Sequence, residues 1–275
     1  AHVLHMTATP IPRTLALVEY GDIDTTKVRE LPRGRQPIKT RVLPETARAD
    51  AFDAARVRLA EGRQVFVVCP LVEESDQLEA RAAIVEAERI ALDEFPDYRV
   101  GLIHGQMPAR EKAAAMEEFV SGKTQALVAT SVIEVGIDVA NAAVMIIEGA
   151  DRYGISQLHQ LRGRIGRGAH AGECFLIGPP ASKRLRAVAS ESDGFKLAEV
   201  DLQLRESGEV LGTRQHGLPR FRVAILPADN LLLERAKQAC DALLNADPAL
   251  SNPEHCLLRD AVVARYGDEL DPIPG

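Results

Sequence analysis

The stretch from Gln125 to Gly168 decides the fold of this chain, and it reads QALVATSVIEVGIDVANAAVMIIEGADRYGISQLHQLRGRIGRG. Its first part is an apolar run, Ala126–Ala129, which is followed by Thr130 and Ser131. In an open α/β sheet, ligands collect in the loops that follow the carboxyl ends of the strands. We therefore expect Ala126–Ala129 to be a strand, and Thr130 to stand at a binding site instead of in the core.

The last part of the stretch reads QLRGRIGRG. Gln160, Arg164 and Arg167 follow one another at i, i+4 and i+7, so a helix would project all three side chains from one face. Gly163 and Gly166 lie between them without side chains, which would allow another backbone or a phosphate to approach closely. GRIGRG (163–168) alone would favour a solvated loop, but the offset of Gln160 and the strand end upstream favour a site.

Strands and helices are expected to alternate over residues 46–178. Short apolar runs such as Val65–Cys69 are typical of strands buried on both faces, and segments of helical length separate them. This alternation predicts βαβ units with right-handed crossovers, which means an α/β fold with a parallel sheet flanked by helices. From Ser182 onward the pattern predicts a helical hairpin, and from residue 226 a small helical C-terminal region.

The composition sets limits on function. The 275 residues are 46% hydrophobic, which allows one large or two ordinary domains with a real core. The net charge of −7 gives no reason to expect an indiscriminate polyanion binder, so any contact with nucleic acid must come from local basic groups. The four cysteines form no CxxC pair, so we expect no metal site. Because the chain has no signal peptide and no long apolar run, we expect a soluble cytoplasmic protein.

Two segments, TSVIEVGIDVANA (130–142) and QLHQLRGRIGRG (157–168), together resemble the fifth and sixth motifs of superfamily 2 helicases. In that family these motifs lie on the second of two RecA-like lobes. The resemblance implies that Gly136 and Asp138 lie near the nucleotide, with Asp138 accepting a hydrogen bond from a ribose hydroxyl. It also implies that Thr130 and Ser131 contact the DNA backbone, where hydroxyl groups position the nucleic acid without reading bases.

The same resemblance assigns chemistry to the arginines. Hydrolysis of ATP requires a cation for the charge that develops on the γ-phosphoryl group, and a planar guanidinium suits that role better than an ammonium group. Arg164 and Arg167 are the candidates, with Gln160 orienting groups around the phosphate. Upstream, VGLIHGQM (100–107) also matches the family. It implies that His104 and Gly105 hold a nucleic-acid phosphate, although a simple strand-to-helix turn is an equal alternative.

The ends of the chain extend the resemblance. TATPIPRTLAL (7–17) is similar to the third helicase motif, which belongs to the first lobe and links the ATP state to DNA, so Thr7 and Thr9 are candidate coupling residues. The expected organisation is therefore the end of the first lobe at 1–27, a proline-rich linker at 28–44 and the second lobe at 45–181. A translocation hairpin and loop should occupy 182–225, and C-terminal helices 226–275.

The hairpin narrows the resemblance to one family. DGFKLAEVDLQLR (193–205) and GEVLGTRQHGLPRF (208–221) resemble the translocation motif shared by the RecG family and the transcription-repair coupling factors. LGTRQ (211–215) and LALVEYGDID (15–24) look specifically like the RecG family. The resemblance implies that Arg205 anchors the hairpin, while Arg214 and Gln215 on the loop push or grip the DNA.

These resemblances imply the C-terminal part of a bacterial, nucleoid-associated, ATP-dependent DNA helicase that remodels branched DNA, such as replication forks and Holliday junctions, in recombination and repair. The expected partners are branched DNA, and the first helicase lobe and N-terminal DNA-binding domain of the same parent chain, with no membrane. ATP and Mg²⁺ would be held mainly by the missing first lobe, because no G-x-x-x-x-G-K-[ST] loop occurs among the 275 residues. We therefore expect this piece alone to be inactive.

Three alternatives remain open. A coupling-factor translocase would share the hairpin but lacks the LGTRQ form, and a long further domain should follow its hairpin. An RNA helicase of the same superfamily would share the fifth and sixth motifs but not residues 193–221. A RecA-like lobe that binds nucleic acid without an ATP cycle would lack the phosphate-binding loop in the full gene.

Overall fold

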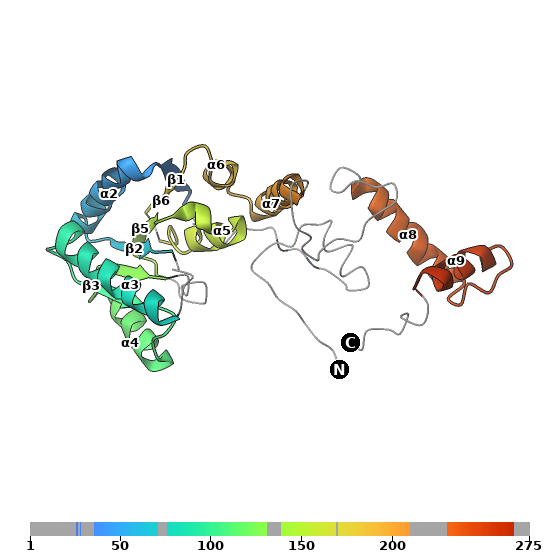
Figure 1. Ribbon diagram of the computed structural model, residues 1–275, viewed down its shortest axis with the longest axis horizontal. Coiled ribbons are helices and arrows are strands. Elements are labelled where there is room, and N and C mark those ends of the chain that lie inside the picture. The colour runs from blue at the N-terminus through green and yellow to red at the C-terminus, as the bar shows by residue number, and fades with distance from the viewer. Residues whose placement is uncertain are drawn as a thin grey trace. The chain divides into compact units, whose positions relative to one another are not determined.

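The computed structural model of the chain describes residues 26, 28, 36–70, 76–130, 139–168, 170–209 and 230–266. The chain divides into two compact units (Figure 1). One unit spans Lys27–Arg205, and the other combines Ala1–Thr26 with Glu206–Gly275. The candidate site residues that the structure describes all lie in the first unit, so the fold of that unit sets the geometry of the site.

The first unit is built on a parallel sheet. Within the described residues, six strands pair in the order β1-β6-β5-β2-β4-β3, and each pair is parallel. The strands are β1 Ile38–Leu43, β2 Gln64–Val68, β3 Val100–Ile103, β4 Ala126–Ala129, β5 Ala142–Ile147 and β6 Gly172–Ile177. The α/β fold with a parallel sheet flanked by helices, which the alternating pattern predicted, is therefore confirmed.

Helices cover both faces of this sheet, and each face has its own apolar core. One face carries α2 Arg48–Ala60 and α3 Asp76–Arg89, which a π-helical turn extends over Ile90–Glu94. The other face carries α4 Ala109–Val120, α5 Ile155–Arg162, α6 Lys183–Ser190 and the first part of α7 Gly194–Glu209. Short 3₁₀ turns occur at Glu45–Ala47 and Ala150–Arg152.

The side chains of strand β4 alternate between the two cores. Leu127 and Ala129 face the core under α4 and α5, while Ala126 and Val128 face the core under α2 and α3. All four residues are fully buried. A central strand of this kind has no polar face, which is why its sequence is a continuous apolar run.

The expected linker at residues 28–44 does not hold for its second half. Residues 38–43 form β1, which pairs with β6 from Ile38↔Gly172 to Leu43↔Ile177. Ile38 and Val42 pack against the core under α5 and α6, while Leu43 packs against the opposite core. The prolines that suggested a linker flank this strand at positions 37 and 44 and do not interrupt its backbone hydrogen bonds.

The hairpin expected after Ser182 is part of the same unit as the sheet. Ser182 Oγ accepts a hydrogen bond from the backbone nitrogen of Leu185 and so caps α6, as expected. Leu185, Val188 and Leu197 are buried in the core shared with α4 and α5. The α6–α7 hairpin is therefore packed on the lobe as far as Arg205, instead of forming a separate module from residue 182.

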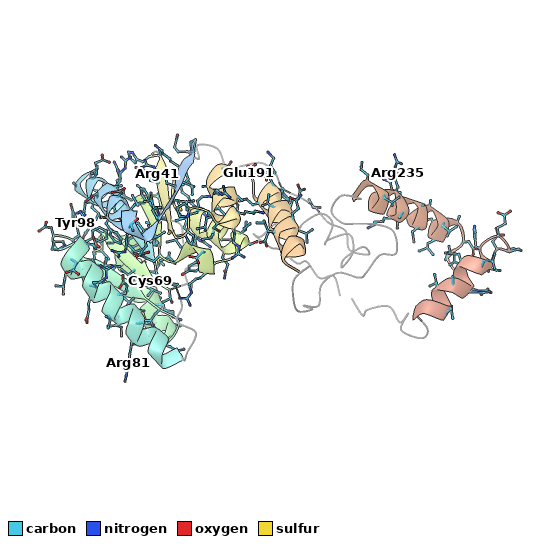
Figure 2. All side chains as sticks on the ribbon, turned by 45° about the horizontal axis from the view of Figure 1, so that its top comes forward. Arg41, Cys69, Arg81, Tyr98, Glu191 and Arg235 are labelled. Carbon is cyan, nitrogen blue, oxygen red and sulfur yellow. The ribbon has the colours of Figure 1, made fainter. Side chains whose placement is uncertain are left out.

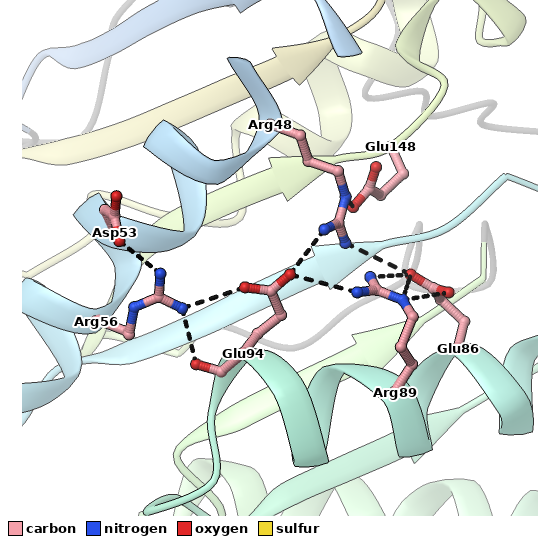
Figure 3. Close-up of polar contacts among 7 residues, drawn as sticks. All are labelled: Arg48, Asp53, Arg56, Glu86, Arg89, Glu94 and Glu148. Atoms are coloured by element: carbon pink, nitrogen blue, oxygen red, sulfur yellow. Dashed lines mark hydrogen bonds and ion pairs between the residues drawn. The ribbon is translucent and has the colours of Figure 1, made fainter. Parts of the chain in front are cut away.

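A network of ion pairs links α2, α3 and the π-helical turn after α3 (Figure 3). Arg48 donates to Glu94 Oε1 at 2.7 Å and to Glu148 Oε1 at 2.8 Å, and its guanidinium lies 4.2 Å from the centre of the Phe52 ring. Glu94 also accepts from Arg56 and Arg89. Burial would raise the pKa of Glu94, but the hydrogen bonds from the three arginines outweigh it, and the pKa lies below its ordinary value.

The pKa of Glu148, in the same network, shifts in the opposite direction from that of Glu94. It follows β5 and is 9% exposed. Burial raises the pKa of Glu148 above its ordinary value, although the charge of Arg48 opposes that shift. Nearby in the first unit, Cys69 is buried, and burial raises the pKa of its thiol to about 12 (Figure 2).

In the second unit, the described part contains α8 Asn230–Ala246 and α9 Cys256–Tyr266, as the sequence predicted. Asp247 orders the turn between them, because its carboxylate accepts hydrogen bonds from the backbone nitrogens of Ser251 and Asn252 and from His255 Nδ1. The hydrogen bond from Asn252, followed by that from His255, holds the pKa of Asp247 well below its usual range. Over the described residues of both units, we find no helix long and apolar enough to cross a membrane.

Candidate functional site

His104 and Thr130 lie side by side at the carboxyl edge of the sheet. His104 follows β3 and Thr130 follows β4, and these strands pair in parallel with Ile103 opposite Ala129. The backbone nitrogen of Thr130 donates to the Ile103 carbonyl oxygen at 3.1 Å, which extends the pairing past the ends of both strands. The two candidate nucleic-acid residues are thus brought together although 26 positions separate them in the sequence.

Both residues carry a buried polar atom that lacks a partner. Within the described structure, neither Thr130 Oγ1 nor His104 Nδ1 makes a hydrogen bond, and Thr130 is only 2% exposed. A buried donor or acceptor left without a partner costs about 1–3 kcal/mol, so such atoms are uncommon in folded proteins. Two of them on neighbouring strand ends are the arrangement expected where a ligand supplies the missing hydrogen bonds.

The turn after His104 provides further polar groups at this edge. Met107 N donates to the His104 carbonyl oxygen at 3.2 Å, and Lys112 Nζ donates to the Gly105 carbonyl oxygen at 2.6 Å. The following helix α4 begins after Pro108, which makes no side-chain capping hydrogen bond. Its first backbone N–H groups therefore remain suited to an anion, and Lys112 adds a positive charge to the same turn.

The segment with Arg164 and Arg167 differs from the expected helix. Helix α5 ends at Arg162, and the backbone nitrogen of Arg164 donates to the Leu161 carbonyl oxygen in a turn. Gly166 has φ +69°, a left-handed conformation that glycine adopts at little cost. The prediction that Gln160, Arg164 and Arg167 share one helix face is therefore wrong. The helix ends at Arg162, so Arg164 and Arg167 lie outside it.

Residues 163–168, which we call the arginine loop, pack closely on the rest of the lobe. Gly166 N donates to the Ala142 carbonyl oxygen at 3.3 Å. A side chain at Gly166 would meet Ile38 Cγ1 at 3.0 Å, and one at Gly168 would clash with the Ala140 carbonyl oxygen. The segment around Gly166 is thus tightly packed, but the nearest atom belongs to the Ile38 side chain and not to another backbone or a phosphate. Arg167 is exposed, and its Nε donates to the Gly163 carbonyl oxygen at 2.9 Å.

The arginine loop and the Thr130 site lie at opposite ends of the strands. Ala142 is the first residue of β5 and Ala140 precedes it, so the loop lies at the amino edge of the sheet. Thr130 follows the last residue of β4 and lies at the carboxyl edge. The sequence did not reveal this separation.

Several other candidates lie outside the described residues. These are Ser131, Gly136 and Asp138 in the connection after β4, Thr7 and Thr9 near the N-terminus, and Arg214 and Gln215 after α7. Arg205 lies within α7, but its side chain is outside the described part. Gln160 lies in α5 and is half-buried. Among the residues that are described, no group of three or more His, Cys, Asp or Glu side chains could hold a metal ion.

The structure adds Arg162, which the sequence reasoning did not single out. Its side chain is almost fully buried, with 5% of the residue exposed, and it donates to main-chain carbonyl groups of Val188 and Glu191. The sequence did contain a pattern that indicates a buried arginine at this position. Arg162 follows Ile155 and Leu158 at i+7 and i+4, which places a charged residue on the apolar face of α5.

Two models of known protein families match consecutive parts of the chain. Residues 48–169, from α2 through the arginine loop, match the family model of the helicase conserved C-terminal domain. Residues 191–264 match the family model described as ATP-dependent DNA helicase RecG, domain 3, C-terminal. The two matched regions follow one another along the chain, with strand β6 and helix α6 between them.

Individual relatives cover nearly all of the chain. The ATP-dependent DNA helicase RecG of Synechocystis sp. is 46% identical over 269 residues, which is 96% of this chain and 32% of the relative. RecG of Escherichia coli K12 is 49% identical over 243 residues, which is 86% of this chain and 35% of the relative. A structure described as RecG bound to a three-way DNA junction matches 82% of this chain and 30% of its own, with TM-score 0.65 and 43% identity. The chain spans about a third of the length of these relatives, and it is homologous to the C-terminal part of the RecG helicases.

Proposed function

We propose that this chain is the C-terminal part of an ATP-dependent DNA helicase that remodels branched DNA, such as replication forks and Holliday junctions, in recombination and repair. The observation that carries the proposal is the pair of unsatisfied polar atoms on His104 and Thr130 at one edge of a RecA-like sheet, with the exposed Arg167 of the arginine loop at the other. Such a lobe can meet DNA and a nucleotide at the same time. Homology to RecG supports the assignment of the chain to a DNA helicase.

At the carboxyl edge, the DNA backbone is the ligand that we assign to His104, Gly105, Thr130 and Ser131. A phosphate oxygen could accept a hydrogen bond from Thr130 Oγ1, and His104 Nδ1 would complete its own hydrogen bonding at the same ligand. The amides at the start of α4 and the charge of Lys112 would favour the phosphate electrostatically. Contacts of this kind position DNA without reading its sequence, as a translocating enzyme requires.

At the amino edge, ATP is the substrate that we assign to Gln160, Arg164 and Arg167, together with Gly136 and Asp138. The guanidinium groups would stabilise charge that develops on the γ-phosphoryl group during hydrolysis. Asp138 would accept a hydrogen bond from a ribose hydroxyl, and Gly136 would lie near the nucleotide. Mg²⁺ and most of the triphosphate would be held by the first lobe of the parent protein, because these 275 residues contain no phosphate-binding loop.

Coupling between the two edges is assigned to the remaining candidates. Thr7 and Thr9 would link the ATP state to DNA from the first lobe, and Arg205 would hold the hairpin while Arg214 and Gln215 contact the duplex. The partners of this chain would be branched DNA and, within the parent protein, the first lobe and an N-terminal DNA-binding domain. Such a protein would work at the bacterial nucleoid, where its DNA substrate is found.

A comparison of the 275-residue chain with its parent tests this proposal. The parent should release phosphate from ATP in a reaction that forked DNA stimulates, and it should unwind the fork. The 275 residues alone should release phosphate no faster than buffer, with or without DNA, because the amide cradle for the phosphates is missing. Hydrolysis by the chain alone would contradict the two-lobe assignment. A parent that binds forks but never hydrolyses ATP would indicate a binding module instead.

A further inference from the structure

Arg152 lies at the same edge of the sheet as Thr130. It is exposed, and it is the last residue of the 3₁₀ turn Ala150–Arg152, which follows the carboxyl end of β5. Strand β2 pairs with β4 on one side and with β5 on the other, and the three strands end at the same level. Two strand spacings, about 10 Å, therefore separate the strand end that carries Thr130 from the strand end that leads to Arg152.

The main chain around Arg152 is held from two sides. Tyr153 Oη donates to the Cys69 carbonyl oxygen at 2.8 Å, which ties the turn to the end of β2. Arg184 Nη1 donates to the carbonyl oxygens of Asp151 and Tyr153 at 3.2 and 3.3 Å, which ties the turn to α6. The residues directly before and after Arg152 are thus fixed by hydrogen bonds, so the backbone of Arg152 has a defined position at this edge.

The side chain of Arg152 lies beside Gly149, which has φ +53°. A Cβ on Gly149 would meet Pro70 Cγ at 3.1 Å and Arg152 Cδ at 3.5 Å, so the stem of Arg152 lies near the end of β2. The adjacent carboxylate is directed elsewhere, because Asp151 Oδ1 lies 3.1 Å from the position that a Cβ on Gly178 would occupy. Within the described residues, the Arg152 guanidinium makes no hydrogen bond or ion pair.

Other exposed arginines of this lobe are paired with carboxylates. Arg41 pairs with Glu173, and Arg99 pairs with Glu118, both at 3.2 Å. Arg152 instead combines a fixed backbone with an uncompensated guanidinium, whose planar donors match the oxygens of a phosphate. Because a DNA strand advances about 3.4 Å per nucleotide, a distance of about 10 Å along this edge corresponds to about three nucleotides.

We propose that Arg152 is a further DNA-binding residue, whose guanidinium contacts a backbone phosphate about three nucleotides from the one held at Thr130. The proposal rests on the proposed function, in which the carboxyl edge meets DNA. Arg152 would extend the DNA contacts from the ends of β3 and β4 across β2 to the end of β5. Thr130 contributes a neutral hydroxyl, whereas Arg152 contributes a full charge. Loss of Arg152 should therefore change how strongly salt weakens the binding of DNA.

The substitution Arg152→Gln in the parent protein tests this. Binding of a labelled fork is measured by fluorescence anisotropy at several salt concentrations between about 0.05 and 0.2 M. Each neutralised phosphate contributes about 0.7–0.9 to the slope of log K against log salt concentration. We expect the slope of Arg152→Gln to be smaller than that of wild type by this amount, and Kd at 0.1 M salt to rise by about 5–8-fold. Thr130→Val should weaken binding without changing the slope.

Two further variants serve as controls. Arg152→Lys keeps the charge and should keep the salt slope of wild type, because lysine also neutralises a phosphate. Arg99→Gln removes an exposed arginine that precedes β3 at the opposite edge of the sheet. It should change neither the slope nor Kd, because exposed charges more than about 10 Å apart are largely screened at 0.1 M salt. Melting temperatures of all variants should equal that of wild type.

The possible results separate the alternatives. A wild-type salt slope in Arg152→Gln would overturn the proposal, and so would an equal decrease in Arg99→Gln, which would indicate an effect of net charge alone. Nucleotide affinity without DNA is measured on the same samples. A loss there, with unchanged fork binding, would assign the guanidinium to the nucleotide and also overturn the proposal. A wild-type parent that binds no forked DNA would refute the proposed function instead.

Discussion

The two edges of the sheet present functional groups in different ways. At the carboxyl edge, Thr130 is placed by the strand itself, almost without exposure and with its hydroxyl unsatisfied. At the amino edge, Arg167 is exposed on a loop whose path depends on glycines and on contacts with β5. Strand ends are rigid and suit binding, whereas an arginine on a short turn can follow a charge that appears during a reaction. Changes at the two edges should therefore affect different quantities.

The largest effect is expected at the amino edge. Arg167→Ala in the parent protein should reduce kcat for ATP hydrolysis by about 10³–10⁵-fold, the range for an arginine that stabilises the transition state. Binding of ATP should suffer much less, because the charge that Arg167 meets arises mainly in the transition state. Arg167→Lys should also fail, since the fork geometry is lost. Steady-state phosphate release and nucleotide binding check both statements, and a kcat close to wild type in Arg167→Ala would remove this residue from the reaction.

Arg164→Ala tests whether the loop acts as a unit. Arg164 is half-buried where Arg167 is exposed, and it lies closer to the end of α5. We expect a loss of kcat of the same kind, and we expect the double variant to lose less than the product of the two single effects, because neighbouring groups on one charge are not independent. A double-mutant cycle on kcat measures this. Strictly multiplicative losses would show that the two arginines do not serve one charge.

A smaller effect, of a different kind, is expected at the carboxyl edge. Thr130→Val removes a hydroxyl without changing the shape of the side chain. If DNA supplies its missing partner, the affinity for forked DNA should fall by about tenfold, which corresponds to one hydrogen bond of roughly 1–1.5 kcal/mol. Without DNA the variant should be as stable as wild type or more so, because no hydroxyl is then buried unsatisfied.

The matched control for Thr130 is Thr124, which precedes β4 at the opposite edge and is also 2% exposed. Thr124→Val should leave DNA affinity unchanged. Fluorescence anisotropy with a labelled fork and thermal melting without DNA give the two readouts. Equal DNA affinities for wild type and Thr130→Val would end the assignment of this edge to DNA.

The smallest effect on activity is expected in the ion-pair network, away from both edges. Glu94→Gln should lower the free energy of unfolding by about 1–3 kcal/mol, because three arginines lose a charged acceptor, and should leave kcat unchanged. Asp53→Asn is the control, since Asp53 is 67% exposed in its side chain and an exposed ion pair contributes little. Thermal melting should rank the two variants in this order, and an equal loss in both would contradict the network's role.

The network also predicts a pH dependence with two opposing parts. The pKa of Glu94 is lowered in the folded state, so its stabilising contribution is present above the unfolded-state pKa and is lost as the pH falls through the folded-state pKa. The pKa of Glu148 is raised by burial, so its contribution is present below the unfolded-state pKa and is lost as the pH rises through the folded-state pKa. Glu94→Gln should therefore lose less stability on acidification than wild type does, and melting curves across the acidic range test this.

Much of the local structure could be predicted from the sequence. The strand at Ala126–Ala129 has the predicted bounds, because an apolar run and the polar residues that end it act over a few positions. The strand β1 was missed, since its alternating residues lie among prolines and basic residues that are also typical of a linker. Only pairing with β6, more than 130 positions away, shows that this segment belongs to the sheet.

For the candidate site, the sequence by itself determined which residue types are present and which strand end carries Thr130, because a buried strand and its terminus are local features. It also carried the homology to RecG through its motifs. The tertiary structure alone decided that α5 stops at Arg162, that the arginine loop and Thr130 occupy opposite edges, and that Arg162 reaches carbonyl groups 26 and 29 positions away. These outcomes depend on hydrogen bonds between segments distant along the chain, such as Gly166 to Ala142, which no local pattern encodes.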